Sequence, residues 1–405
     1  MPPDSAGERL ACARITSAEA LEGLCAEWDE LWARCPDATP FQSPAWLIPW
    51  WRAFGNGELY VLTFRDRGRL VALVPLYLGA VHDGGARVVR LLGSGNSDYV
   101  DGLFLPGFEI AAANRCFAEL GQLHAHWDRC DLLELRPASP LLHATAPAAW
   151  HDEIGEAGIV SQVPLTGSDP DAGIPRPFLK KLRYFARLAE RSGGVRVQRA
   201  DEATFEESFA TMVRLHETRW AARAERGMLA DPAVHAFNRE AARALLRRGL
   251  LRLHTLFVGP RAAASSYGFL HGERAYCYLT GFDPDFGRLS PGHLVLQHAI
   301  HEAAREGARN FDLLRGREAY KARWQGAEVA NRRRTLSLPT VWREAPPHLP
   351  HLGRCGAHFA GLNAKSLSCS TEGCPAVDPL ADHWRRHRPA LYRFVGLAPP
   401  EVLSR

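Results

Sequence analysis

The sequence predicts a layered α/β protein made of two lobes, each with a mixed central sheet flanked by helices. The chain has 405 residues, which is too long for one ordinary domain and fits two lobes plus an extension. The same order of helices and strands can be read twice, on either side of a segment rich in glycine and proline at 166–177. Hydrophobic residues make up 46% of the chain, which is enough to bury a large core.

The first lobe is expected over residues 1–165. Apolar side chains recur every three to four residues between Glu19 and Arg34, which predicts an amphipathic helix. The other elements follow from apolar runs bounded by turn residues such as Asp83-Gly84-Gly85. They are a tryptophan-rich helix over 44–54, strands over 58–65, 70–78 and 86–92, a helix over 111–127 and a strand over 131–135. The predicted order is therefore two helices, three strands, a helix and a strand.

The second lobe is expected over 178–340, beyond the linker at 166–177, and it repeats this order. Its elements are a basic helix over 177–191, a strand over 195–199, helices from 204 and over 232–248, strands over 251–258, 262–271 and 274–281, a helix from 292 and a strand over 310–314. The two halves share no readable sequence identity, so their duplication is inferred from element order alone. Residues 341–405 lose the regular pattern and are expected to form an irregular extension.

Composition limits the classes of function. A formal charge of +4 is too small for a protein devoted to coating nucleic acid. The first residues lack the basic and apolar segments of a signal peptide, and the longest apolar run, near 70–81, is interrupted by Pro75 and is too short to span a membrane. Nine cysteines spread along the chain favour reduced thiols over a disulfide framework. These features predict a cytoplasmic protein without a membrane span.

A predicted helix start near residue 290 is the clearest candidate for ligand binding. Ser290 is of a type that caps helices, Pro291 suits the first helical position, and Gly292 allows another group to approach closely. Backbone N–H groups at such a positive helix end are suited to a pyrophosphate. The predicted phosphate-binding residues are Arg288, Ser290, Pro291, Gly292, His293 and Leu294. An ordinary capped helix is the alternative interpretation.

Several motifs resemble those of one known family. They are Ser-Pro-Gly at the helix start, the pattern Asp-x-x-Arg-Gly-x-x-x-Tyr-Lys-x-x-Trp over 312–324, and the segments 41–46, 91–99 and 216–220. In these residues the chain resembles the GNAT-type acetyltransferase family that includes the bacterial cellulose-biosynthesis protein CelD and is related to the Fem peptidoglycan aminoacyltransferases. The resemblance extends over roughly residues 15–340, so it covers both lobes. In one departure, Ser290 stands where the family usually has the first glycine of Arg-x-x-Gly-x-Gly.

The resemblance implies two tandem GNAT-like lobes and an acyltransferase activity. The donor would be acetyl-CoA or another acyl-CoA bound by the second lobe. The acceptor would be an amine, or less readily a hydroxyl, of a small molecule or sugar held in the cleft between the lobes. The implied setting is polysaccharide or cell-envelope biosynthesis.

Two other functions stay open. A Fem-like enzyme would use aminoacyl-tRNA as donor, and its basic helix would border the cleft. A non-catalytic scaffold in exopolysaccharide synthesis would have a closed or filled pocket beneath Ser290.

Four residues are candidates for catalysis, namely His216, Asp312, Tyr320 and Lys321. His216 has the side-chain pKa nearest neutrality and would act as general base at the rim of the cleft, with a hydrogen-bonded core histidine as the alternative. Asp312 lies in an apolar strand, so we expect a cationic partner such as Arg315, Lys321 or Arg323. It would be either one half of a structural ion pair or a base whose pKa is raised by burial. Tyr320 is a candidate to protonate the departing thiolate, and Lys321 is a candidate to hold an anionic group.

The acceptor is expected to meet a second group of side chains, which comprises Asp98, Tyr99, Trp220, Arg315 and Tyr278. Each has a simpler alternative, since glycine-bounded turns, strand tyrosines and helix-face tryptophans are common structural features. The basic helix carries Lys180, Lys181, Arg183, Arg187 and Arg191, which form either a solvated face or a surface for phosphates or RNA.

No metal site is predicted. Near the C-terminus the histidines and cysteines match no paired spacing of zinc ligands. These residues are His351, Cys355, His358, Cys369 and Cys374.

Overall fold

The first half of the chain forms an α/β lobe. The computed structural model describes residues 10–79, 86–123, 125–165 and 169–337. The elements of the first lobe are β1 (Ala11–Ile15), α1 (Ala18–Gly23), α2 (Cys25–Arg34), η3 (Pro40–Gln42), α3 (Pro44–Phe54), β2 (Gly57–Asp66), β3 (Arg69–Gly79), β4 (Val88–Leu91), β5 (Leu103–Phe104), α4 (Glu109–Gln122), β6 (Arg129–Leu135), α5 (Pro140–His143) and β7 (His151–Pro164). The helix predicted from Glu19 to Arg34 is thus two helices, with Leu24 ending the first and preceding the second.

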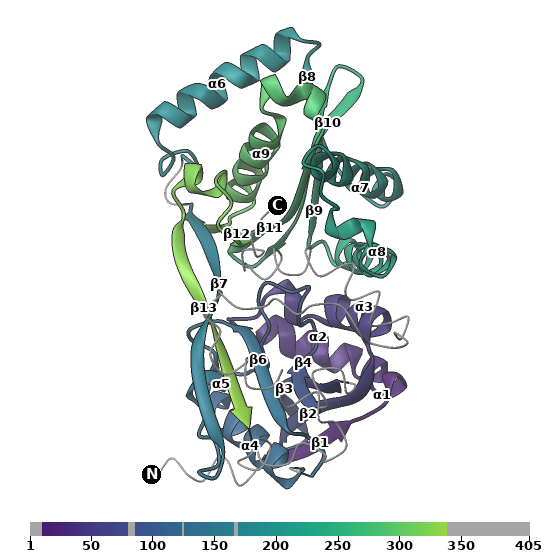
Figure 1. Cartoon of the computed structure of the whole chain (residues 1–405), viewed down its shortest axis with the longest axis vertical. Helices are drawn as coiled ribbons and strands as arrows, with labels where there is room; N and C mark the ends of the chain where they lie inside the picture. The colour runs from purple at the N-terminus through teal and green to yellow at the C-terminus, as the bar shows by residue number, and fades with distance from the viewer. Residues whose placement is uncertain (1–9, 80–85, 124, 166–168, 338–405) are drawn as a thin grey trace, which may run out of the picture.

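The second half repeats this order. Its elements are α6 (Arg176–Arg191), β8 (Val195–Arg199), α7 (Phe205–Ala221), η4 (Met228–Ala230), α8 (Pro232–Arg247), β9 (Leu251–Val258), β10 (Arg261–His271), β11 (Arg274–Phe282), η5 (Pro284–Leu289), α9 (Pro291–Arg305), β12 (Asn310–Arg315), η6 (Lys321–Trp324) and β13 (Ala327–Ser337). Helices α7 and α9 lie on opposite faces of β9, β10 and β11 (Figure 1). The predicted class, a mixed sheet flanked by helices, is confirmed.

The strands of both lobes join into one sheet. Its order is β1-β2-β3-β4-β6-β13-β7-β12-β11-β10-β9-β8, with β5 paired to β3. Leaving aside β5, β7 and β13, each lobe contributes five strands in the same order, and these include one parallel pair, β4 with β6 and β11 with β12. The repeated topology supports the inferred duplication. The domain boundaries at 165 and 178 stay a prediction.

Each half of the chain adds a strand to the sheet of the other half. Strand β13, at the end of the second lobe, pairs with β6 of the first, and β7 pairs with β12 of the second. The two strands also pair antiparallel with each other, from Ala327 opposite Gln162 to Ser337 opposite His151. They run side by side along one edge of the molecule between the lobes (Figure 1). This exchange, together with β7 and β13 themselves, was not predicted from the sequence.

Aromatic rings pack where the two lobes meet. The ring of Trp46 lies 4.8 Å from that of Phe237 and 5.2 Å from that of Tyr278, and Phe41 lies 5.8 Å from Phe269. These residues belong to one core that includes side chains of both lobes. Among the described residues, packed rings therefore occupy this part of the expected interlobe cleft.

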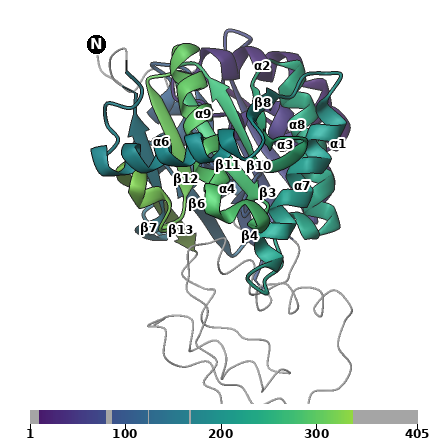
Figure 2. The ribbon, with the colours of Figure 1, turned by 90° about the horizontal axis from the view of Figure 1, so that it is seen from above.

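Helix α6 crosses the outer end of the second lobe (Figure 2). It packs on α9, η5 and β8, burying Phe178, Leu182 and Ala189. Its basic residues, including Lys180 and Lys181, are exposed, as an amphipathic surface helix requires. This confirms the basic helix predicted over 177–191.

Two expectations from composition can be compared with the structure. Within the described ranges, no helix is long and apolar enough to cross a membrane. The described cysteines are all free thiols, and they are Cys12, Cys25, Cys35, Cys116, Cys130 and Cys277. The histidines and cysteines considered for zinc near the C-terminus lie outside the described residues.

Candidate active site

The start of α9 is a turn rather than a side-chain cap. Ser290 has φ 52° and ψ 49°, which is the left-handed conformation, and its side chain accepts no capping hydrogen bond. Instead its hydroxyl lies 2.9 Å from Nδ1 of His293. Ser290 is thus the N-cap residue of α9, as predicted, but it lacks the side-chain capping bond, because η5 ends directly at Ser290 and the chain turns there before α9 begins.

Two of the N–H groups predicted to bind phosphate are already used. The N–H groups of His293 and Leu294 both donate to the carbonyl of Ser290, at 3.0 and 3.3 Å. Pro291 has no N–H group and is buried, whereas Arg288 is exposed. Of the residues predicted to bind phosphate, His293 and Leu294 therefore have their backbone N–H groups engaged within the helix start.

A cavity of about 300 Å³, here called the α6 cavity, lies beside this turn. Its lining residues are Pro175, Pro177, Phe178, Lys181, Ala322, Arg323 and Gln325. The ring of Phe178 connects the cavity to α9, since it lies 5.4 Å from the ring of His293. Lys181 and Arg323 are exposed cations, so the cavity has a positive rim and an apolar wall. Sequence reasoning missed Phe178, although its place on the apolar face of the basic helix was a usable signal.

His293 lies between the α6 cavity and the centre of the second lobe. Its ring is 6.3 Å from that of Trp324 and 6.5 Å from that of Tyr320. Burial, with smaller effects of Arg323 and Arg219, lowers the pKa of His293 to about 4. Its Nε2 atom is buried and has no hydrogen-bond partner among the described residues. The imidazole is therefore neutral at physiological pH, with one nitrogen unengaged.

The space beyond the paired part of β11 and β12 is filled by η6. The two strands pair over three residues only, from Arg274 to Tyr276 on β11. Trp324 is fully buried in the core cluster that also contains Cys277 and Leu313. A filled region beneath the start of α9 is the feature that the scaffold hypothesis required.

Lys321 is buried and holds the end of β12. Its ammonium donates to the carbonyls of Leu314 and Arg315 at 3.2 and 2.6 Å, and it pairs with Glu318 at 3.0 Å. All of its donors thus have partners, so Lys321 is engaged in shaping this loop.

Asp312 has different partners from those expected. Tyr99 and Gln162 donate to its Oδ2 atom, and the N–H of Leu314 donates to Oδ1 at 2.7 Å. The expected pairing with Arg315 or Lys321 is wrong, because Leu314 adopts a left-handed φ of 59° at a bulge in β12 and changes the direction of the following residue. Burial raises the pKa of Asp312 to about 6.

Arg315 instead joins a buried ion cluster between the lobes. Its guanidinium donates to Asp98 at 3.0 Å and to Glu134 at 2.9 Å. Asn331 of β13 completes the cluster, since its amide donates to Glu134 at 2.8 Å and to the carbonyl of Asp98 at 2.9 Å. Burial raises the pKa of Asp98, against the opposing effect of Arg315. Asp98 and Arg315, both predicted to bind the acceptor, are thus engaged with each other.

His216 lies inside the second lobe rather than at a rim. Its Nε2 accepts a hydrogen bond from the indole of Trp220 at 3.0 Å, and a Cβ placed on Gly227 would come within 2.6 Å of Nδ1. Burial lowers the pKa of His216 to about 3. These contacts support the alternative of a packed core histidine, and Trp220 is its partner.

The tyrosines differ in their exposure. Tyr99, Tyr276 and Tyr278 are buried, and the hydroxyl of Tyr278 donates to the carbonyl of Asn96 at 2.8 Å. Tyr320 is half-buried beside Arg219, whose guanidinium carbon lies 5.9 Å from its ring centre. Burial raises the pKa of Tyr320 well above its usual value, so the phenol stays protonated.

Comparison with known families identifies the second lobe. Residues 176–322 match the family model described as an acetyltransferase (GNAT) domain. This range runs from α6 to η6 and includes the α6 cavity and the start of α9. This part of the chain is therefore similar to GNAT-type acetyltransferase domains. No curated protein matches the chain at a significant level.

Solved structures share the arrangement of both lobes. The crystal structure of FemX is 11% identical, covers 80% of this chain and 96% of its own, and has a TM-score of 0.59. A conserved protein of unknown function from Bacteroides thetaiotaomicron is 12% identical, with coverages of 80% and 100% and a TM-score of 0.53. The C-terminal domain of a putative lysylphosphatidylglycerol synthetase from Agrobacterium fabrum is 13% identical, with coverages of 79% and 92% and a TM-score of 0.51. At these identities the likeness shows the fold alone.

Proposed function

We propose that the chain is a GNAT-type N-acyltransferase that moves an acetyl or other acyl group from acyl-CoA to an amine, or less readily to a hydroxyl. The observation that carries this proposal is the family match over 176–322, which takes in the second lobe through η6. The setting that we propose is polysaccharide or cell-envelope biosynthesis in the cytoplasm, in a branch like that of CelD, and it is supported by the motif resemblance.

The α6 cavity is the proposed site for the donor. Lys181 and Arg323 would neutralise the coenzyme phosphates, Lys as a point charge and Arg as a planar fork. Phe178 would supply an apolar wall for the pantetheine arm. The volume of about 300 Å³ is at the lower end of the range for small-molecule sites, so a part of the coenzyme would extend into solvent.

In the proposed reaction the acceptor amine attacks the thioester carbonyl directly, its proton passes to a base or to water, and the coenzyme leaves as thiolate. Tyr320 is the proposed acid for that thiolate, because it is half-buried, stays protonated and lies near His293 at the start of α9. Like Tyr320, the residues Asp312, Lys321 and His216 lie outside the lining of the α6 cavity. Roles for them in catalysis remain proposals, with His216 the weakest candidate because a base with a pKa of about 3 accepts protons poorly.

Isothermal titration with coenzyme A tests the donor site. Lys181→Glu and Arg323→Glu should each weaken affinity at least tenfold, because each reverses a charge that would face the phosphates. Lys180→Glu is the matched control, since it makes the same charge change on the neighbouring exposed residue outside the lining. Equal losses in all three variants would show a diffuse charge effect, and unchanged affinity in the first two would remove the donor from this cavity. Mass spectrometry with acyl-CoA and a panel of amino sugars and amines would then name the acceptor.

Two observations favour other functions. Lys181 of the basic helix α6 lines the α6 cavity, which suits an aminoacyl-tRNA donor there, although α6 crosses the outer end of the second lobe and not the interlobe cleft; in that case tRNA binding should fall steeply with salt. The buried ring of Trp324 lies 6.3 Å from the ring of His293 near the start of α9, which suits a scaffold with a filled pocket. A scaffold should neither bind coenzyme A nor release it from acyl-CoA.

A further inference from the structure

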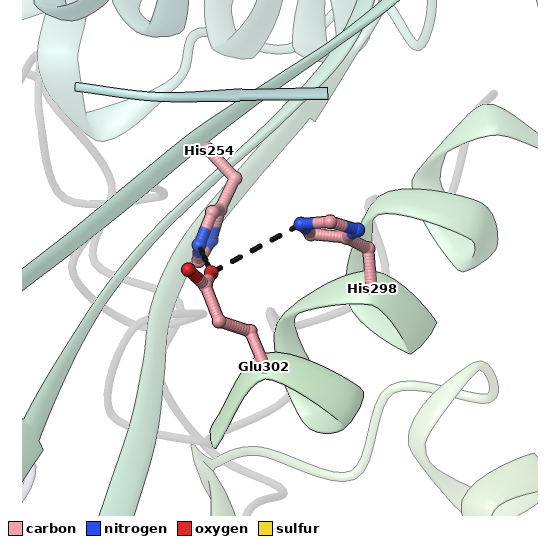
Figure 3. Close-up of side chains that lie close together, drawn as sticks. All are labelled: His254, His298 and Glu302. Atoms are coloured by element: carbon pink, nitrogen blue, oxygen red, sulfur yellow. Dashed lines mark hydrogen bonds and ion pairs between the residues drawn. The ribbon is translucent and has the colours of Figure 1, made fainter. Parts of the chain in front are cut away.

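Three side chains of metal-binding type meet between β9 and α9. His254 comes from β9, and His298 and Glu302 come from α9, where they lie one turn apart on the same face. Figure 3 shows the two imidazoles converging on the carboxylate of Glu302. One potential ligand atom from each residue lies within 4.8 Å of the other two. The three residues are called the α9 triad below.

The carboxylate of Glu302 is held in one orientation by its neighbours. Its Oε2 atom contacts Nε2 of His254 and lies 4.0 Å from Nε2 of His298. Its other oxygen, Oε1, pairs with Arg199 at 3.3 Å. Arg199 also binds Glu306 at 3.2 Å, so it is held in place by a second carboxylate. An outer partner of this kind fixes the direction in which a metal ligand presents its free oxygen.

The α9 triad is incompletely bonded within the protein. At 4.0 Å, Nε2 of His298 is too far from Glu302 for a hydrogen bond, and Nδ1 of His254 is buried without a partner among the described residues. A charged carboxylate and neutral imidazole are the forms that bind metal.

Two imidazoles and one carboxylate are a known zinc donor set. Zinc bonds of about 2.0–2.2 Å in tetrahedral geometry place ligand atoms roughly 3.3 Å apart. The gap of 4.0 Å between His298 and Glu302 would have to shorten by about 0.7 Å, and the close contact between His254 and Glu302 would have to open to admit the ion. The side chain of His298 is 35% exposed, so a change of its rotamer can supply that movement without rebuilding the core.

We propose that His254, His298 and Glu302 bind a zinc-type divalent transition metal that fastens α9 to β9, with water completing the coordination. The inference goes beyond the proposed function and does not depend on it, because it uses none of the residues of the α6 cavity. Its structural consequence concerns the same helix, since a metal between β9 and α9 would stabilise the position of the α9 start.

Zinc titration of the tag-free, chelator-treated full chain tests the proposal. Isothermal titration should show binding in the micromolar range or tighter, and His298→Ala should remove one equivalent of zinc. His301→Ala is the matched control, because His301 lies on the same helix, is also 35% exposed and pairs instead with Asp171. Cobalt(II) should give a visible absorption band typical of a site with fewer than six ligands in the unaltered chain and lose it in His298→Ala.

Each outcome decides the proposal. The number of zinc ions per chain that each variant loses separates this site from any other zinc bound by the chain. The melting temperatures of the metal-free forms show whether the variants fold. Glu302→Gln, which keeps the side-chain shape, should also lose the equivalent. The same zinc stoichiometry and affinity in the unaltered chain, His298→Ala and Glu302→Gln would overturn the proposal, and so would an equal loss in His301→Ala. Absence of any saturable binding would leave His254 and Glu302 as an ion pair alone.

Discussion

At the scale of single residues, the candidate site contains buried carboxylic acids whose pKa values are raised. Asp312 is held by Tyr99, Gln162 and the N–H of Leu314, all of which donate to it. These bonds favour the ionised form, but burial disfavours it more strongly, so the pKa is raised to about 6. An acid with this pKa is poised near neutrality, where small changes in its surroundings change its charge.

A first prediction concerns the pH dependence of stability. An unfolded aspartate has a pKa of about 3.9. The carboxyl group of Asp312 therefore binds its proton more tightly in the native protein than in the unfolded chain. The free energy of unfolding should fall as pH rises from roughly 4 to 6, and Asp312 should account for up to about 3 kcal/mol of that fall. Asp312→Asn should remove this part of the fall when the free energy of unfolding is measured with urea at several pH values.

Asp101 is the matched control, since burial raises its pKa to about 6 as well. Asp101→Asn should remove the part of the pH dependence of unfolding free energy that Asp101 causes and keep the part that Asp312 causes. If Asp312→Asn shows the same pH dependence of unfolding free energy as the unaltered chain, the pKa of Asp312 is not raised. If the variant loses turnover while the slope is unchanged, the carboxylate acts in catalysis and not in the proton balance of folding.

At the scale of elements, one buried cation adds several side-chain contacts to the strand pairing that attaches β13 to the first lobe. Arg334 donates to the carbonyls of Leu141 and Ala144 at 2.7 and 2.8 Å and forms a two-pronged pair with Asp152. Its guanidinium carbon also lies 4.8 Å from the ring centre of Phe117. One side chain thus ties β13 to β7, to α5 and to α4.

A second prediction follows for this strand. Arg334→Met should lower the free energy of unfolding by about 3 kcal/mol, because it leaves carbonyls and a carboxylate without their partner. Arg332→Met, on the same strand, should change it by less than about 0.5 kcal/mol, since Arg332 is 41% exposed and its ion pair with Glu156 spans 3.9 Å. Urea unfolding of both variants gives the comparison. Equal effects would mean that strand pairing, and not Arg334, attaches β13.

At the scale of the whole molecule, the exchanged strands make the lobes interdependent. The first lobe needs β13 to cover β6, and the second needs β7 to cover β12. The ion cluster of Arg315 also draws on both halves, through Asp98, Glu134 and Asn331. We therefore expect the described part of the chain to unfold as one cooperative unit.

The third prediction tests this interdependence by truncation. A chain that ends at residue 337 keeps β13 and should show a single thermal transition by circular dichroism. A chain that ends at residue 326 lacks β13, exposes the edge of β6 and should be unfolded or aggregated. If the shorter chain melts at the same temperature as the longer one, β13 is dispensable and the lobes are independent.

Much of the fold could be predicted because its signals are local. Strand β9 was expected over the same residues that it occupies, and α8 and α6 agree within a residue or two. Apolar periodicity and turn residues act over a few positions, so they can be recognised in a single sequence. The same holds for the helix start near 290, whose position was predicted although its capping geometry was not.

The sequence by itself thus determined the class of fold, the order of most elements and the place of the motifs. Tertiary structure alone decided the rest. Strand β7 is exposed along its first half and β13 carries three consecutive arginines, so neither shows the apolar alternation of a typical strand. Tyr99 and Asp312, or Asp98 and Arg315, are more than two hundred positions apart, and no local pattern records which distant group will compensate a buried charge. Contacts of that kind arise only when the lobes pack together.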